Sequence, residues 1–262
     1  MSRKNKSLGT VNQVTQILDS LFFGKYHFEV AMVLRSSMLL SSLLLNSEAW
    51  VNISDKDIRS LEQADENFLN KVLGCDPKTS NVFKYLELGI YPIRFEIMKR
   101  KVLFLKYILQ QDKKSMMFKV FEATCENPVK KDFVKTCRKY LELLNINLSF
   151  DNITEMTKHK FKQMVKNSVS EAAFKYLLEE KGKQSKIANL EYSKLEIQEY
   201  LVVGNKNTEI SKLLFKARGK SLDIKTHKKW KYDDDICVGC GVQKETETEI
   251  LACEKLQFSV WK

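Results

Sequence analysis

The chain has 262 residues, of which 44% are hydrophobic, so it can bury a core and has room for one or two domains. Its nine glycines and three prolines argue against a sandwich or barrel, which needs many turns, and favour long helices. The formal net charge is +11, which suits an acidic partner. No apolar stretch of about 18 residues predicts a membrane span, and no hydrophobic region typical of a secretory signal follows the basic start.

Three helices are predicted over the first 75 residues. Apolar side chains recur at helical spacing over 8–22, and the run 27–46 is apolar on most faces, so other helices should nearly enclose it. Over 53–74, Ser54 is a suitable N-cap and Gly74 a suitable stop.

Further helices are predicted beyond the break at Asp76-Pro77. They cover 82–89, 92–111, 116–125, 129–144, 151–181, 190–203 and 209–217, and Asp151 or Thr154 would cap the longest. No series of alternating strands, no nucleotide-type glycine loop and no internal repeat is present in the sequence. We therefore expect an all-α fold in three parts: 1–75, 76–218 and a small Cys-rich region over 219–262.

The charge is unevenly distributed near the C-terminal end. Residues 212–231 carry one acid, Asp223, and eight basic residues: Lys212, Lys216, Arg218, Lys220, Lys225, Lys228, Lys229 and Lys231. Such a density, with Trp230 inside it, indicates contact with a polyanion as readily as a solvated surface. Residues 232–253 reverse the balance, with six acids and one lysine.

The six cysteines fall into two groups. Cys75, Cys125 and Cys137 are isolated in apolar helical surroundings and are interpreted as buried free thiols. Without a secretory signal we expect a reducing compartment, the nucleus or the cytoplasm. There the group at 237, 240 and 253 is better explained by metal binding than by disulfides.

The spacing Cys237-x2-Cys240 is half of a tetrahedral zinc site, because two intervening residues let both sulfurs reach one ion. Cys253 would be the third ligand. Glu249 lies four residues earlier on a predicted short helix, so both side chains share one face. Three interpretations stay open: a site for one zinc ion completed by Glu249, His227 or water; a degenerate site; or coincidence, which the spacing disfavours.

No catalytic residue is assigned. The three histidines do not form a constellation, and the acidic triple at 233–235 is interpreted as a solvated loop because neighbouring side chains point apart. We therefore expect a binding protein rather than an enzyme.

Several segments resemble the C-terminal part of non-LTR (LINE-type) retrotransposon reverse transcriptases. Leu45-Asn46-Ser47-Glu48-Ala49-Trp50 matches an "L…S-E-A/T-W" ending, and the stretch that ends in KVLG at 71–74 matches the helix after it. YLELGIYPIRFEIMKRKVLFLKYIL is similar to the helical connection beyond. CVGCGVQKETETEILAC, with the basic stretch before it, resembles the family's cysteine motif.

This resemblance implies a thumb-like bundle over 1–75, an α-helical linker over 76–218, and a zinc knuckle that holds template RNA or target DNA. Lys25, Arg35 and the basic stretch with Trp230 would then face nucleic acid. The palm with its paired aspartates and any endonuclease are absent from the sequence, and Glu249 stands where the family has histidine. Both departures imply a truncated copy.

Two alternatives accompany this hypothesis. The chain could be a non-catalytic scaffold whose apolar 30–45 face binds another protein, such as the missing palm, or it could be a non-functional retrotransposon relic.

Overall fold

The computed structural model describes residues 3–20, 26–51, 53–127, 132–202, 208–227, 229 and 231–253. Within these residues the chain is helical, and the β-type pairings are two isolated bridges, Leu88 with Ile197 and Ile236 with Lys244. The predicted all-α class is therefore confirmed. In the described part of the chain, no helix combines the length and the apolar character that crossing a membrane requires.

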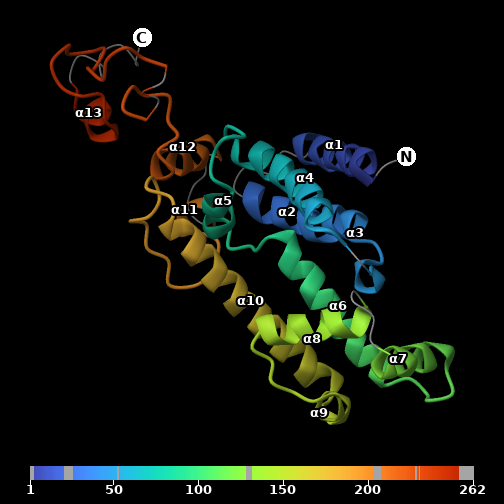
Figure 1. Ribbon diagram of the computed structural model, residues 1–262. Coiled ribbons are helices and arrows are strands. Elements are labelled where there is room, and N and C mark those ends of the chain that lie inside the picture. The colour runs from blue at the N-terminus through green and yellow to red at the C-terminus, as the bar shows by residue number, and fades with distance from the viewer. Residues whose placement is uncertain are drawn as a thin grey trace.

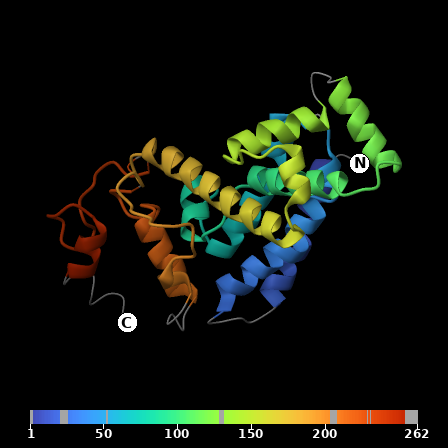
Figure 2. The same cartoon turned by 90° about the horizontal axis from the view of Figure 1, so that it is seen from below.

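Two long helices, α6 and α10, lie side by side and connect the two ends of the helical body (Figures 1 and 2). The elements in chain order are α1 Arg3–Ser20, α2 His27–Leu34, a π-helical turn Arg35–Leu39, α3 Leu40–Leu43, a 3-10 turn Ser47–Ala49, α4 Asp55–Leu73, α5 Asn81–Glu87, α6 Ile93–Leu109, α7 Met116–Glu126, α8 Phe133–Leu143, α9 Phe150–Glu155, α10 Lys158–Gly182, α11 Glu199–Val202, α12 Thr208–Arg218 and α13 Glu247–Ala252. Figure 1 shows α13 and its loops standing apart from this body, beyond α12.

The predicted boundaries of α4 are confirmed. The Ser54 hydroxyl accepts the N–H of Asp57, whose carboxylate accepts the N–H of Ser54 in return. At the other end Gly74 takes a left-handed conformation with φ of 58°, which glycine adopts without steric cost.

Two buried apolar clusters form the core. The first gathers side chains of α1 to α5 with Phe215 of α12, and the second gathers side chains of α7 to α9. Helix α6 contributes Ile93 to the first and Val102 to the second, while α10 contributes Leu177 and Phe161 in the same way. The first cluster thus continues across residue 75, where the sequence suggested a boundary.

The segment 27–46 is interrupted rather than continuous. A π-helical turn over Arg35–Leu39 separates α2 from α3. Nine of its twelve apolar residues are buried or half-buried, but Val33, Met38 and Leu45 are exposed. The 30–45 run therefore serves mainly as core, and only scattered apolar side chains reach the surface.

Two other helix predictions were wrong. The helix expected over 151–181 is divided into α9 and α10, because Ser149 and Thr157 each cap a new helix by accepting a backbone N–H. Neither Asp151 nor Thr154 is the cap. Of the described part of the helix expected over 190–203, which ends at 202, the residues Glu199–Val202 are helical. The described residues before them are non-helical, and Ile197 is bridged to Leu88 at the end of α5.

Arg35 is buried and paired with a carboxylate, contrary to the expectation that it is exposed to nucleic acid. Its guanidinium donates to both carboxylate oxygens of Asp65 on α4, each at 2.7 Å, and to the Tyr91 carbonyl at 3.3 Å. The two charged side chains are 8% and 0% exposed. A buried charge needs such a partner, so Arg35 connects the π-helical turn to α4 and to the start of α6.

We expect Asp65→Asn to lower the free energy of unfolding by about 3–5 kcal/mol, because it leaves the Arg35 charge buried without a carboxylate. Urea denaturation measures this change. The matched control is Glu196→Gln, which breaks the exposed Lys194–Glu196 pair and should cost less than about 1 kcal/mol. Equal losses in the two variants would contradict a structural role for the buried pair.

Candidate metal centre

Cys237 and Cys240 lie in a short hairpin at the C-terminal end of the described chain. The Cys237 N–H donates to the Gln243 carbonyl at 2.7 Å, and the Gly241 N–H donates to the Cys237 carbonyl at 2.9 Å. Gly241 has a φ of 68°, a conformation that glycine adopts readily. The turn therefore brings both sulfurs to one side of the hairpin.

Glu249 and Cys253 come from α13, which follows directly. The Thr246 hydroxyl caps this helix by accepting the Glu249 N–H at 3.1 Å. The Cys253 N–H in turn donates to the Glu249 carbonyl at 2.7 Å. Residues four apart share a helix face, so this turn directs both side chains toward the hairpin.

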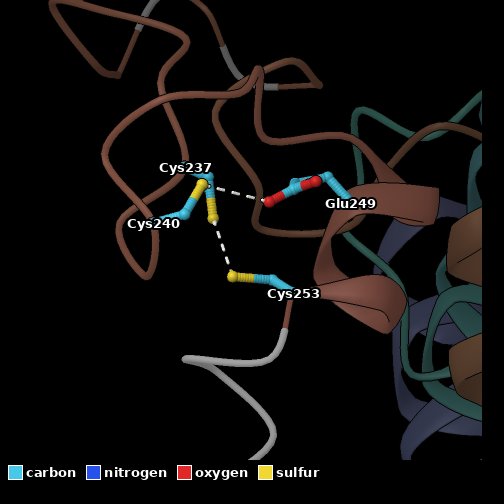
Figure 3. Close-up of side chains that lie close together, drawn as sticks. All are labelled: Cys237, Cys240, Glu249 and Cys253. Carbon is cyan, nitrogen blue, oxygen red and sulfur yellow. Dashed lines mark hydrogen bonds between the residues drawn. The ribbon is translucent and has the colours of Figure 1, made fainter.

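The three sulfurs and a Glu249 oxygen converge, as the spacing predicted. All four atoms lie within 4.8 Å of one another. Figure 3 shows the four side chains pointing toward one another. Cys240 Sγ lies 3.2 Å from Glu249 Oε1, and Cys237 Sγ lies 3.8 Å from Cys253 Sγ. Cys237, Glu249 and Cys253 are buried, Cys240 is half-buried, and all three cysteines are free thiols. His227 is buried but is not a member of this group.

The spacing of these atoms suits a tetrahedral metal. An ion bound by thiolates at about 2.3 Å requires sulfurs about 3.8 Å apart, which is the separation of Cys237 Sγ and Cys253 Sγ. The carboxylate faces the remaining sulfur, so each ligand has a place at one corner. The residues present therefore fit a four-coordinate ion.

Glu245 organises the loop around this group, although no motif in the sequence singles it out. Its buried carboxylate accepts the N–H of Lys225 at 3.0 Å and the N–H of Val238 at 3.2 Å. Its carbonyl accepts the Thr226 hydroxyl, and its N–H donates to the Asp235 carbonyl at 2.7 Å. Glu245 thereby joins the cysteine hairpin to the end of the basic stretch.

The acidic residues fold back onto the basic stretch. Lys225 pairs with Asp234 at 2.7 Å and Lys231 with Asp223 at 2.9 Å. The hydrogen bond between Lys225 and Asp234 raises the pKa of the lysine and lowers that of the aspartate. Such pairs near the surface are worth little in stability. The Lys231 side chain stays 50% exposed, whereas that of Lys225 is 15% exposed.

The predicted nucleic-acid contacts differ in their surroundings. Arg218 donates to the fully buried Glu87 at 3.1–3.2 Å and so has a structural partner. Lys220 and Lys229 are exposed, and Lys216 is half-buried. Lys25, Lys228 and Trp230 lie outside the described residues.

The other cysteines are free thiols away from the cluster. Cys137 is buried in the second apolar cluster, and this burial raises its pKa to about 12. Cys75 and Cys125 are half-buried rather than buried, and burial raises the pKa of each. All three should therefore be weak nucleophiles at neutral pH.

Comparison of the chain with protein-family models, with curated proteins and with solved structures finds no match.

We expect Glu245→Gln to loosen the hairpin, because a single amide oxygen replaces the two carboxylate oxygens that accept backbone N–H groups. Losing a charged hydrogen bond costs about 1.5–3 kcal/mol, so at least one of the Lys225 and Val238 amides should exchange with solvent about 10-fold to 100-fold faster. Amide hydrogen exchange followed by NMR measures this. Asp233→Asn, at an exposed residue with the same charge change, is the control. Unchanged protection of both amides would show that the Glu245 carboxylate does not hold the hairpin to the basic stretch.

Proposed function

We propose that this chain binds nucleic acid and that its C-terminal hairpin and α13 hold one zinc ion, as in the C-terminal part of a non-LTR retrotransposon reverse transcriptase. The observation that carries the proposal is the convergence of three thiols and one carboxylate within 4.8 Å, in a loop that Glu245 ties to the basic stretch. The resemblance in the cysteine motif and in the LNSEAW segment is its second support.

Zinc suits this ligand set better than other common ions. Thiolates are soft ligands that favour zinc over magnesium or calcium, and structural zinc sites are closed and tetrahedral. Such an ion would be held by Cys237, Cys240, Glu249 and Cys253, and it would supply structural cohesion to a module with little apolar core. Three cysteines with a glutamate are a less usual ligand set for zinc than three cysteines with a histidine. We therefore expect Glu249 to limit the affinity of the site for zinc.

The proposed role is binding, without chemistry of its own. The exposed Lys229 and Lys231 lie in the short segment between Lys225, whose N–H donates to Glu245, and Cys237. A metal that orders this loop would fix the position of those charges. Lysine charges contact phosphates and release condensed counterions from them, which is the main source of sequence-independent affinity.

One zinc ion per chain is the first expected result. Cys240→Ser should lower zinc affinity by more than about 100-fold, because one of the four residues that bind the ion directly is lost. Glu249→His should raise it, since a neutral nitrogen completes a more common set. Metal content by mass spectrometry of the native protein, and competition with a chromophoric chelator, measure both.

The control for the zinc experiment is Cys125→Ser, which removes a free thiol outside the cluster and should leave zinc content unchanged. Alkylation offers an independent readout: a chelator should expose Cys237, Cys240 and Cys253 to iodoacetamide while the buried Cys137 stays unmodified. Alkylation of the three cluster cysteines at the same rate with and without chelator would argue against bound metal.

Binding to RNA or DNA should weaken as salt rises. Each phosphate contact steepens the slope of log K against log salt by about 0.7–0.9. Changing Lys229 and Lys231 together to Ala should therefore reduce the slope by about 1.5, measured by fluorescence anisotropy with a labelled oligonucleotide. Lys113 and Lys114, exposed at the opposite end of the body between α6 and α7, provide the matched double-Ala control. An equal effect of the two double variants would exclude the basic stretch as the specific contact.

A further inference from the structure

A pocket of about 480 Å³ lies where three distant segments meet at the base of the Cys-rich module. Its lining comes from the turn 76–80 before α5, from the segment 183–187 after α10 and, after α12, from 219–221 and His227. Among its described lining residues, four lysines face one acid, a formal excess of three positive charges. These lysines are Lys78, Lys183, Lys186 and Lys220.

A close backbone approach builds the α12 side of this pocket. A Cβ at Gly219 would lie 2.5 Å from the Phe83 ring of α5, so only glycine lets the chain pass there. Arg218, the preceding residue, is held by Glu87 at 3.1 Å. Lys220 follows with a φ of 48°, and the Ser221 N–H donates back to the Lys216 carbonyl at 2.8 Å. The position of Lys220 is therefore set by packing and hydrogen bonds on both sides.

The acidic residue in the lining is already engaged by its own turn. One carboxylate oxygen of Asp76 accepts the Lys78 N–H at 2.7 Å, and its carbonyl accepts the Thr79 N–H at 2.9 Å. A carboxylate used in this way holds the turn that presents Lys78 to the pocket. Glu180, outside the lining, pairs with Lys183 at 2.5 Å. The two carboxylates together offset only part of the positive charge of the four lysines.

The rest of the lining favours a phosphate over a base. The Ser80 hydroxyl accepts the Phe83 N–H at 3.3 Å as the cap of α5, so its own proton remains available to donate. Ser185 adds a second hydroxyl. The described lining holds no Phe, Tyr or Trp ring on which a base could stack. Ammonium groups and hydroxyls together match the acceptor oxygens of a phosphate.

We propose that this pocket binds a phosphate group. This inference rests on the proposed function, because the phosphate belongs to the backbone of a nucleic acid that passes from the basic stretch onto the helical body. His227 lines the pocket one residue beyond Thr226, whose hydroxyl donates to Glu245 beside the cysteine hairpin. The pocket and the Cys-rich module are therefore continuous, and one strand can contact both.

The test uses a triple variant, Lys78→Gln with Lys186→Gln and Lys220→Gln, all at exposed residues. Its control changes Lys162, Lys166 and Lys175, exposed along α10, to Gln. We expect the salt slope for a labelled single-stranded RNA to fall by about 2 in the first variant, since three contacts at about 0.7 each are lost. The control should keep the slope of the unmodified chain, and thermal unfolding should show that both variants fold.

A second arm identifies the source of the phosphate. Inorganic phosphate and pyrophosphate are titrated into the ¹⁵N-labelled full chain, with saturable shifts expected at the amides of 78–80, 185–186 and 220–221 and lost in the triple variant. Such shifts with an unchanged RNA slope would retain the phosphate site and overturn its nucleic-acid source. If neither the shifts nor a change in slope is observed, the proposal is overturned. A chain that binds no RNA but shows the shifts would reject the proposed function alone.

Discussion

The buried carboxylate of Glu87 connects the C-terminal part of the described chain, which carries the candidate metal centre, to the helical body. It is fully inaccessible to solvent on α5, and it accepts hydrogen bonds from the hydroxyls of Tyr192 and Tyr200 and from Arg218. Burial and the adjacent charge raise the pKa of both tyrosines, so they remain hydrogen-bond donors. A buried anion requires partners of this kind. Arg218, the partner that lies on α12, sets where the chain leaves the body toward the lysine pocket and the cysteine hairpin.

The local signals in the sequence located most helices, because caps and apolar periodicity act within a few residues. The Ser54 cap and the Gly74 stop of α4 are examples. The errors came from contacts between distant segments. The family resemblance placed Arg35 at nucleic acid, but its partner in the structure is Asp65, which lies 30 residues away in the sequence. The non-helical path before α11 likewise depends on pairing with Leu88 of the α5 region, which local propensity does not encode.

The candidate metal centre was more predictable than its surroundings. Two residues lie between Cys237 and Cys240, and Glu249 and Cys253 are four positions apart. Both spacings constrain geometry directly, and the four atoms do converge. Glu245 could not be chosen in the same way, because its role depends on backbone N–H groups of Lys225 and Val238 that only the folded loop brings near it. The lysine pocket was equally hidden, since its lining comes from three segments more than 30 residues apart.

The course of α6 and α10 through both apolar clusters has a consequence for cooperativity. Each helix places its two ends in different clusters, so neither cluster can lose its packing without releasing part of a helix that the other needs. The helical body should behave as one unfolding unit rather than as two independent domains. A cut near residue 75 would separate α4 from Phe83 and Leu86, which share its cluster, and would leave apolar surface exposed on both fragments.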